Sequence, residues 1–210
     1  MNNYRNNVIN LYSQVIEPVG YVEGKEVSFN GSQIQDEFFK AWECIDAYYT
    51  ERKPTHLSFL EIGAYKGLWA LALAEFCKQK GITFEYATVT YMEQDPNNNP
   101  LYGVQEYYKT IEASFTLVNS PSQNPAALEQ LPQTEYNIVF IDGDHRYEMV
   151  KEDIEIYRPL ATDMLLFHDI RPIYTNPSCG VYQAIEEAEI TLDEQIIVDG
   201  QWMGIGIHYV

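Results

Sequence analysis

Residues 57–80 read LSFLEIGAYKGLWALALAEFCKQK: a short apolar run, a turn that contains Gly63 and Gly67, and a stretch rich in alanine and leucine. An apolar run of this length that ends at glycine is typical of a buried strand, and the stretch after it favours a helix. Four more pairs of a strand-like run and a helix-like run follow before residue 191. The chain from residue 57 onward therefore alternates strands and helices.

Five such units predict an α/β fold, because alternating strands and helices build a mostly parallel sheet with helices on both faces. Residues 194–210, EQIIVDGQWMGIGIHYV, read as two strands around a tight Asp-Gly turn. This hairpin is expected to add an antiparallel strand at one side of the sheet. The predicted architecture has three layers, helix on sheet on helix.

Residues 1–56 differ from the remainder in composition and pattern. Apolar side chains at helical spacing predict one helix around Val8 to Ile16 and a stronger one around Ile34 to Tyr49, which ends before Pro54. Residues 17–32, with three glycines and one proline, predict a loop. We expect residues 1–56 to form a helical cap or lid over a domain of residues 57–210; the alternative is that these helices only cover a sheet face.

Charge and composition exclude several classes of function. The 210 residues include 13 Lys and Arg against 31 Asp and Glu, a net charge of −18. Such a surface repels phosphate backbones and anionic membranes, so neither nucleic acid nor membrane is an expected partner. Three cysteines without a C-x-x-C pair, and an N-terminus without an apolar signal core, favour the cytoplasm.

The first strand ends in Glu61, Gly63, Ala64, Tyr65 and Gly67. Glycines here let the backbone approach a ligand closely, and a carboxylate can hold a positive group by a charge-assisted hydrogen bond. The spacing G-x-x-x-G lacks the middle glycine of the dinucleotide fingerprint, and no G-K-[ST] follows, so a P-loop is excluded. The alternative is that Glu61 caps the turn and the glycines only allow tight packing.

The next two strands also end in polar residues. Glu93 follows the second strand, where an acid usually grips ribose hydroxyls, although it lies 26 residues after Gly67 and thus slightly late. Asn119 and Ser120 follow the third strand, where they contact an adenine edge or cap the next helix.

The fourth and fifth strands end in acids and histidines. Asp142, Gly143, Asp144 and His145 follow the fourth strand, and His168 and Asp169 close the fifth. Because carboxyl ends of neighbouring parallel strands meet at one edge, Asp142, Asp144 and Asp169 are expected to form an oxygen-rich pocket for Mg²⁺ or Mn²⁺. His145 or His168 would act as a general base or a metal ligand. The alternatives are a helix-capping acid and a buried structural histidine.

Three segments together, FLEIGAYKGLWALALA (59–74), VFIDGDHRYEMVKEDIEIYRPL (139–160) and LLFHD (165–169), resemble the class I S-adenosylmethionine-dependent methyltransferases. More narrowly, the chain is similar to the branch that carries I-D-G-D-H-x-Y after the fourth strand, many of whose members modify sugars and secondary metabolites. The resemblance covers residues 57–210 and implies a Rossmann-like sheet of seven strands whose last strand is antiparallel.

The resemblance also implies roles for single residues. Glu61 and Gly63 would lie beside the methionine part of the cofactor, Glu93 at the ribose, and Asp142 below the sulfonium. Metal-dependent relatives pair an acid at Asp142 with one at the place of Asp169. The full set expected at the cofactor is Glu61, Gly63, Ala64, Tyr65, Gly67, Glu93, Asn119, Ser120, Asp142 and Gly143.

The predicted function is methyl transfer to a hydroxyl of a small acceptor, with Asp142, His145 and His168 as the candidate catalytic residues. Positioning does most of the work in this reaction, because the methyl donor is already activated. The alternative from another class is a non-catalytic binding or assembly module with the same fold. The exposed sheet edge and the N-terminal helices are candidate surfaces for a homo-oligomer.

Overall fold

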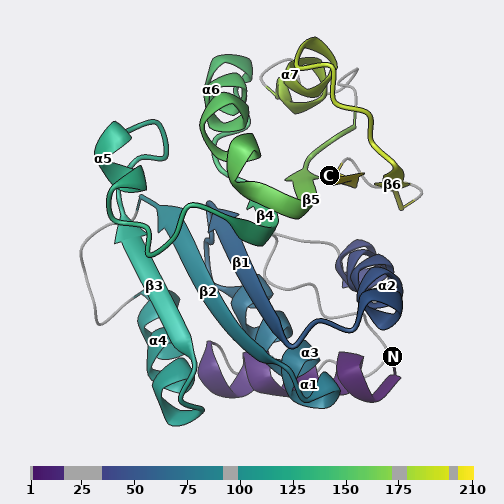
Figure 1. Cartoon of the computed structure of the whole chain (residues 1–210), viewed down its shortest axis with the longest axis vertical. Coiled ribbons are helices and arrows are strands. Elements are labelled where there is room, and N and C mark those ends of the chain that lie inside the picture. The colour runs from purple at the N-terminus through teal and green to yellow at the C-terminus, as the bar shows by residue number, and fades with distance from the viewer. Residues whose placement is uncertain (1, 17–34, 92–98, 172–178, 199–202) are drawn as a thin grey trace.

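A computed structural model of the chain describes residues 2–16, 35–91, 99–171, 179–198 and 203–210 (Figure 1). The strands are β1 (His56–Ile62), β2 (Thr83–Thr90), β3 (Ser114–Asn119), β4 (Tyr136–Ile141), β5 (Ala161–His168), β6 (Glu194–Ile196) and β7 (Ile205–Tyr209). The helices are α1 (Asn2–Val15), α2 (Gln35–Arg52), α3 (Leu68–Lys80), α4 (Pro100–Thr110), α5 (Pro125–Leu128), α6 (Tyr147–Tyr157), the 3-10 helix η1 (Arg158–Leu160) and α7 (Val181–Glu187).

The seven strands form one sheet in the order β3-β2-β1-β4-β5-β7-β6. The five strands from β1 to β5 are parallel to one another, whereas β7 runs antiparallel to both β5 and β6. The predicted α/β architecture with an antiparallel C-terminal hairpin is therefore confirmed. The strand order reverses between β1 and β4, and in open sheets ligands bind beyond the carboxyl ends of the strands at such a point.

Two apolar clusters lie on the two faces of the sheet and make it the middle of three layers (Figure 1). The first joins α1 to α4 with one face and includes the fully buried Trp42 and Trp69, whose rings are 5.5 Å apart. The second joins α5 to α7 with the other face. β1 is buried along all but its first residue, as expected for a central strand covered on both sides.

The N-terminal helices share the first of these clusters. α1 packs on α3 and α4, and the Tyr4 hydroxyl donates a 3.1 Å hydrogen bond to the Ala72 carbonyl. α2 buries Phe38 and Trp42 against Trp69, so its apolar stripe faces the body of the protein. Among the described residues, no helix combines the length and the apolar character needed to cross a membrane.

Local sequence sets the boundaries of the helices. Gly67 and Gly81 adopt left-handed backbone at the start and the end of α3, with φ of 79° and 68°. The Asn99 side chain caps α4 by accepting a hydrogen bond from the Leu101 amide, and Pro100 occupies the first turn. Glycine at both ends of α3, and asparagine followed by proline at the start of α4, therefore set where these helices begin and end.

Two predicted strand boundaries differ from the structure, and three predicted features lie outside the described residues. β2 ends at Thr90 and not at residue 93, and the expected loop 17–32 lies outside the described residues, as does Glu93. β6 ends at Ile196 and β7 begins at Ile205, so the hairpin strands are shorter than predicted. The expected Asp199-Gly200 turn is also outside the described residues.

Gly63, directly after β1, lies in close contact with Asp142, directly after β4. Its φ is 91°, and a Cβ atom added there would lie 2.2 Å from the carbonyl oxygen of Asp142. The missing side chain is what allows the two strand ends to come together at the edge where the sheet reverses.

Gly63→Ala is expected to destabilise the protein far more than Gly81→Ala, as measured by thermal unfolding. Both glycines have positive φ, which costs a non-glycine residue about 1–2 kcal/mol. Only Gly63 also lacks space, since nothing lies within 4 Å of a Cβ at Gly81. Equal losses in Tm for the two variants would show that the contact with Asp142 is not tight.

Candidate active site

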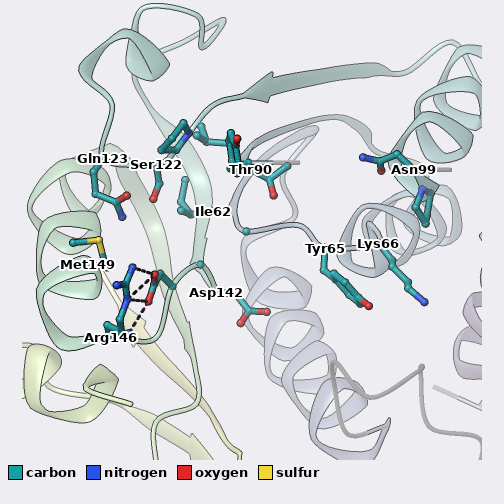
Figure 2. A pocket seen from close by; sticks show the side chains of 17 residues that line it. Ile62, Tyr65, Lys66, Thr90, Asn99, Ser122, Gln123, Asp142, Arg146 and Met149 are labelled. Carbon is teal, nitrogen blue, oxygen red and sulfur yellow. Dashed lines mark hydrogen bonds and ion pairs between the residues drawn. The ribbon is translucent and has the colours of Figure 1, made fainter. Parts of the chain in front are cut away.

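A cavity of about 930 Å³ lies at the carboxyl ends of β1, β2 and β4 (Figure 2). Its lining residues are Ile62, Gly63, Tyr65, Lys66, Val89, Thr90, Tyr91, Asn99, Pro100, Pro121, Ser122, Gln123, Asp142, Gly143, Asp144, Arg146 and Met149. Figure 2 shows the Asp142 carboxylate between the β1 turn, which carries Tyr65, and the segment with Arg146. The cavity therefore sits where the reversal of strand order predicts a ligand.

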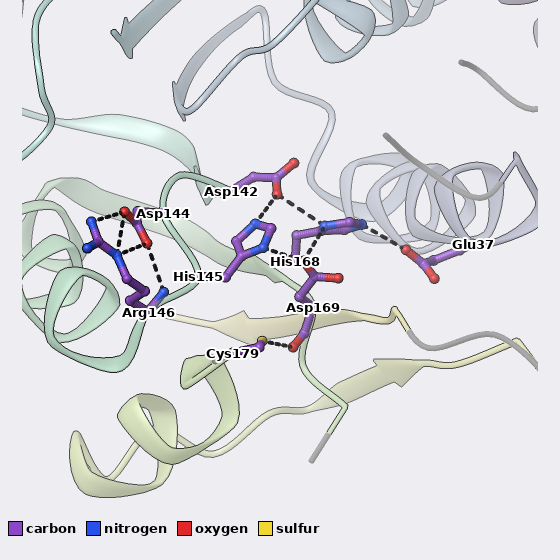
Figure 3. A network of polar contacts seen from close by, with 8 residues as sticks. All are labelled: Glu37, Asp142, Asp144, His145, Arg146, His168, Asp169 and Cys179. Carbon is purple, nitrogen blue, oxygen red and sulfur yellow. Dashed lines mark hydrogen bonds and ion pairs between the residues drawn. The ribbon is translucent and has the colours of Figure 1, made fainter. Parts of the chain in front are cut away.

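A polar cluster adjoins this cavity at Asp142 (Figure 3). His168 Nδ1 lies 3.1 Å from Asp142 Oδ1, and His145 Nε2 lies 3.6 Å from the same oxygen. His145 Nδ1 lies 2.9 Å from Asp169 Oδ2. On its far side, His168 Nε2 lies 3.1 Å from Glu37 Oε1. These five residues are called the acid–histidine cluster.

Four of the five residues come from two neighbouring strand ends. Asp142 follows β4, His145 lies in the turn before α6, and His168 is the last residue of β5. Asp169 follows with a φ of 57°, a left-handed backbone that is uncommon for a residue other than glycine. Glu37 comes from the first turn of α2, in the N-terminal part of the chain.

Burial and pairing set the protonation of the acid–histidine cluster. Burial works to raise the pKa values of Asp142 and Asp169, but the two imidazoles outweigh it and hold both carboxyls below their usual range. Hydrogen bonds to Asp142 and Asp169 raise the pKa of His145 to about 10. Burial alone would lower the pKa of His168, yet the surrounding carboxylates raise it well above its usual value. Three carboxylates thus face two imidazoles, an arrangement that favours a further positive charge.

Several buried polar atoms in this cluster lack an aligned hydrogen-bond partner within the described part of the chain: Glu37 Oε2, His168 Nδ1 and Asp169 Oδ1. The 3.1 Å contact of His168 Nδ1 with Asp142 is thus an ion pair and not an aligned hydrogen bond. Polar atoms left unsatisfied in one place are costly and mark a position for a water, an ion or a ligand group. The unsatisfied polar atoms are consistent with a site that binds a polar or charged ligand.

The structure brings Asp142, His145, His168 and Asp169 together, as the sequence predicted for the two strand ends. Asp144 lies apart from them: its carboxylate accepts hydrogen bonds from the backbone and side chain of Arg146. Asp142, His145 and His168, and not the expected triple-aspartate set, offer ligand atoms within 4.8 Å of one another.

The residues expected at the cofactor divide into two groups. Gly63, Tyr65, Asp142 and Gly143 line the cavity. The others that the structure describes are absent from its lining: Glu61, Ala64, Gly67, Asn119 and Ser120. Their assignment to the cofactor stays a prediction.

Glu61 is buried beside the cavity. The Tyr86 hydroxyl donates a hydrogen bond to its carboxylate, and burial raises the pKa of Glu61 above its usual value. After β3, it is Pro121, Ser122 and Gln123 that line the cavity, one to three residues beyond the predicted Asn119 and Ser120.

Glu37 is the residue of the acid–histidine cluster that sequence reasoning missed. It lies on the buried face of α2, one helical turn before Ala41 and two before Ile45, both of which are fully buried. An acid in line with an apolar stripe is the available signal, because a carboxylate buried at such a position needs a partner.

Asp153 of α6 contacts a residue of the cavity lining and makes the stability of the fold depend on pH. Its side chain is fully buried, and the Gln123 amide, which lines the cavity, donates a 2.9 Å hydrogen bond to Oδ1. Burial is the main cause that raises the pKa of Asp153 to about 6. The pKa of the same carboxyl in the unfolded chain is near 4. The folded state therefore binds the proton more tightly, so the fold is most stable below pH 4. This stabilisation is lost as the pH rises through 6.

We expect Asp153→Asn to be more stable than the parent protein at pH 7, by about 3 kcal/mol, and equally stable at pH 4. The asparagine keeps an oxygen that accepts the hydrogen bond from Gln123 but carries no charge. Chemical unfolding at the two pH values measures the difference, with Glu152→Gln on an exposed position of the same helix as control. A stability gain that is the same at both pH values would contradict the assignment.

Comparisons with known proteins were made for sequence and for structure. Residues 60–170 match a family model described as a methyltransferase domain. Comparison with curated proteins found no match. The structure is similar to the methyltransferase PaMTH1 from Podospora anserina bound to SAH, with a TM-score of 0.56 and 17% identity over 98% of this chain and 88% of that one.

Two further solved structures are similar in fold. CalS11, a TDP-rhamnose 3'-O-methyltransferase of calicheamicin biosynthesis, aligns with a TM-score of 0.56 and 16% identity over 99% of this chain and 93% of that one. MycE, a methyltransferase of mycinamycin biosynthesis in complex with Mg, SAH and mycinamycin VI, aligns with a TM-score of 0.53 and 13% identity over 97% of this chain and 54% of that one. At these identities the likeness concerns the fold.

Proposed function

The chain belongs to the family of methyltransferase domains, and we propose that it transfers the methyl group of S-adenosylmethionine to a hydroxyl of a small acceptor, a sugar or a secondary metabolite. The observation that carries the proposal is the acid–histidine cluster at the edge of the cavity. CalS11, whose substrate is a TDP-sugar, supports the choice of a hydroxyl acceptor by similarity of fold.

The cavity fits the donor in position and charge. Gly63, which lines the cavity, lets the backbone after β1 approach Asp142 more closely than any residue with a Cβ would permit. Asp142, at the rim of the acid–histidine cluster, is ionised and directed into the cavity. When bound, S-adenosylmethionine supplies an activated methyl group on a positively charged sulfur, and a carboxylate at this place favours that charge.

His145 is the proposed general base for the acceptor hydroxyl. Asp169 holds its Nδ1 at 2.9 Å, which directs Nε2 toward Asp142 and the cavity, and its side chain is 41% exposed. His168 is only 2% exposed and is enclosed by Asp142 and Glu37, so it is less suited to receive a proton. In the structure as described the pKa of His145 is about 10, and positive charge placed at Asp142 would lower it toward the range useful for a base.

A divalent cation is the second way in which this site would activate the hydroxyl. Asp142, His145 and His168 would hold it, and a bound ion would lower the pKa of an acceptor hydroxyl. Two imidazoles and one carboxylate suit Mn²⁺ better than Mg²⁺, which prefers oxygen ligands. His145 would then be a ligand and not the base. MycE, a structural neighbour, was solved with Mg.

Residues 1–56 are proposed to cap the acceptor side of the site. The support is that α2 carries Glu37 into the acid–histidine cluster, so the N-terminal part contributes a side chain as well as a covering layer.

His145→Gln is expected to lower the rate of methyl transfer by about 10²–10⁴-fold, the range for loss of a general base. The assay follows release of S-adenosylhomocysteine over a panel of nucleotide sugars and small phenols. Binding of S-adenosylmethionine, measured by calorimetry, should be retained or tightened and not weakened, because His145 does not line the cavity and its loss removes a positive charge beside Asp142.

His56→Gln is the matched control, since His56 bonds Thr83 and Glu85 at the opposite end of the strands. Turnover of His145→Gln equal to that of His56→Gln would remove His145 from the mechanism. Repeating the assay with a chelator separates the two modes of activation: full activity without divalent ions favours the base, and activity restored by Mn²⁺ favours the metal.

A further inference from the structure

We infer that Glu37 is a positioning residue: its carboxylate holds the His168 ring in the orientation that places Nδ1 3.1 Å from Asp142 Oδ1, so that α2 completes the catalytic centre. The inference rests on the proposed function only in giving this centre a catalytic role. The contact itself joins two residues that are 131 positions apart in the chain.

Glu37 is fully buried, and the contact with His168 satisfies one of its two oxygens. A carboxylate removed from water and left unpaired is costly, so its presence within an apolar stripe calls for a partner. Oε1 lies 3.1 Å from His168 Nε2, within hydrogen-bond distance. The acids that face the same region are Asp142 and Asp169, which repel Glu37 and leave His168 as its one attractive contact in the part of the chain that is described.

The two nitrogens of an imidazole lie on different sides of one rigid ring, so fixing one sets the direction of the other. With Nε2 on Glu37, Nδ1 lies 3.1 Å from Asp142 Oδ1 and 3.5 Å from Asp169 Oδ2 (Figure 3). Phe140 restricts the ring from the side, with an interplanar angle of 82° at 6.4 Å. Without Glu37, nothing in the described residues would hold the far nitrogen.

α2 is itself anchored close to Glu37. The Phe38 ring lies 5.0 Å from that of Trp69, and the Trp42 ring stacks on Phe59 at 6.4 Å. These contacts fix the first turns of α2 against the sheet, so the carboxylate of Glu37 is held at a set position. A carboxylate held at a set position orients the imidazole that it contacts. Residues that hydrogen-bond to metal ligands and to catalytic bases commonly have this role.

Two substitutions at Glu37 distinguish a role in orienting the His168 ring from a role in the stability of the fold. Glu37→Gln keeps an oxygen that accepts a hydrogen bond from Nε2, whereas Glu37→Leu keeps similar size but no acceptor. Glu75→Gln is the matched control: Glu75 is 5% exposed and also bonds an N-terminal helix, through Asn7 at 2.6 Å, away from the acid–histidine cluster.

The direct measurement is the imidazole N–H resonance of His168 in the proton NMR spectrum of the full chain with S-adenosylhomocysteine bound. The chain has four histidines, so His168→Gln assigns the signal. We expect a slowly exchanging Nε2–H resonance in the parent protein that is unchanged in Glu75→Gln, shifted in Glu37→Gln and lost in Glu37→Leu. An unmoved resonance in Glu37→Gln, or its survival in Glu37→Leu, overturns the inference.

Turnover provides the second readout, with the acceptor that the panel identifies. Glu37→Leu should lower kcat by about 10–100-fold, the loss typical of a supporting residue, and Glu37→Gln should recover most of it. A loss in Glu37→Leu no greater than in Glu75→Gln, at equal Tm, contradicts the catalytic part. If no acceptor in the panel is methylated, the proposed function fails, and the NMR result alone decides the role of Glu37.

Discussion

Buried negative charge at the carboxyl edge of the sheet is the constraint on which the site depends. Glu37, Asp142 and Asp169 are largely withdrawn from water, and two imidazoles share the space between them. Removing carboxylates from water is tolerated only with close partners of opposite charge. The strand ends, the left-handed backbone of Asp169 and the packing of α2 all serve to bring these partners within about 3–4 Å of one another.

The same electrostatic balance links the cluster to the cavity. Asp142 belongs to both, since it lines the cavity and contacts the two imidazoles. A cation bound beside Asp142 would relieve the mutual repulsion of the carboxylates and loosen the hold on the proton of His145. Under the proposed function, binding of a positively charged ligand and deprotonation of His145 would be coupled through one carboxylate.

The sequence predicted the sheet and much of the acid–histidine cluster because both depend on local pattern. Apolar runs followed by glycine fix the strands, and the rule that parallel strands end at one edge brings His168 and Asp142 together. The same rule fails for Asp144. It follows the same strand, but its carboxylate accepts hydrogen bonds from Arg146, two residues later, and lies away from the other acids. Glu37 was missed because the path of α2 over the sheet depends on packing between distant segments.

The most direct test of the charge argument compares S-adenosylmethionine with S-adenosylhomocysteine, which differ by the methyl group and the positive charge on sulfur. Isothermal calorimetry on the parent protein and on Asp142→Asn measures both affinities. The account predicts micromolar binding of the cationic donor, and a greater loss of affinity for it than for the neutral product when Asp142 loses its charge. No heat with either compound at millimolar concentration, or equal losses for both, would contradict it.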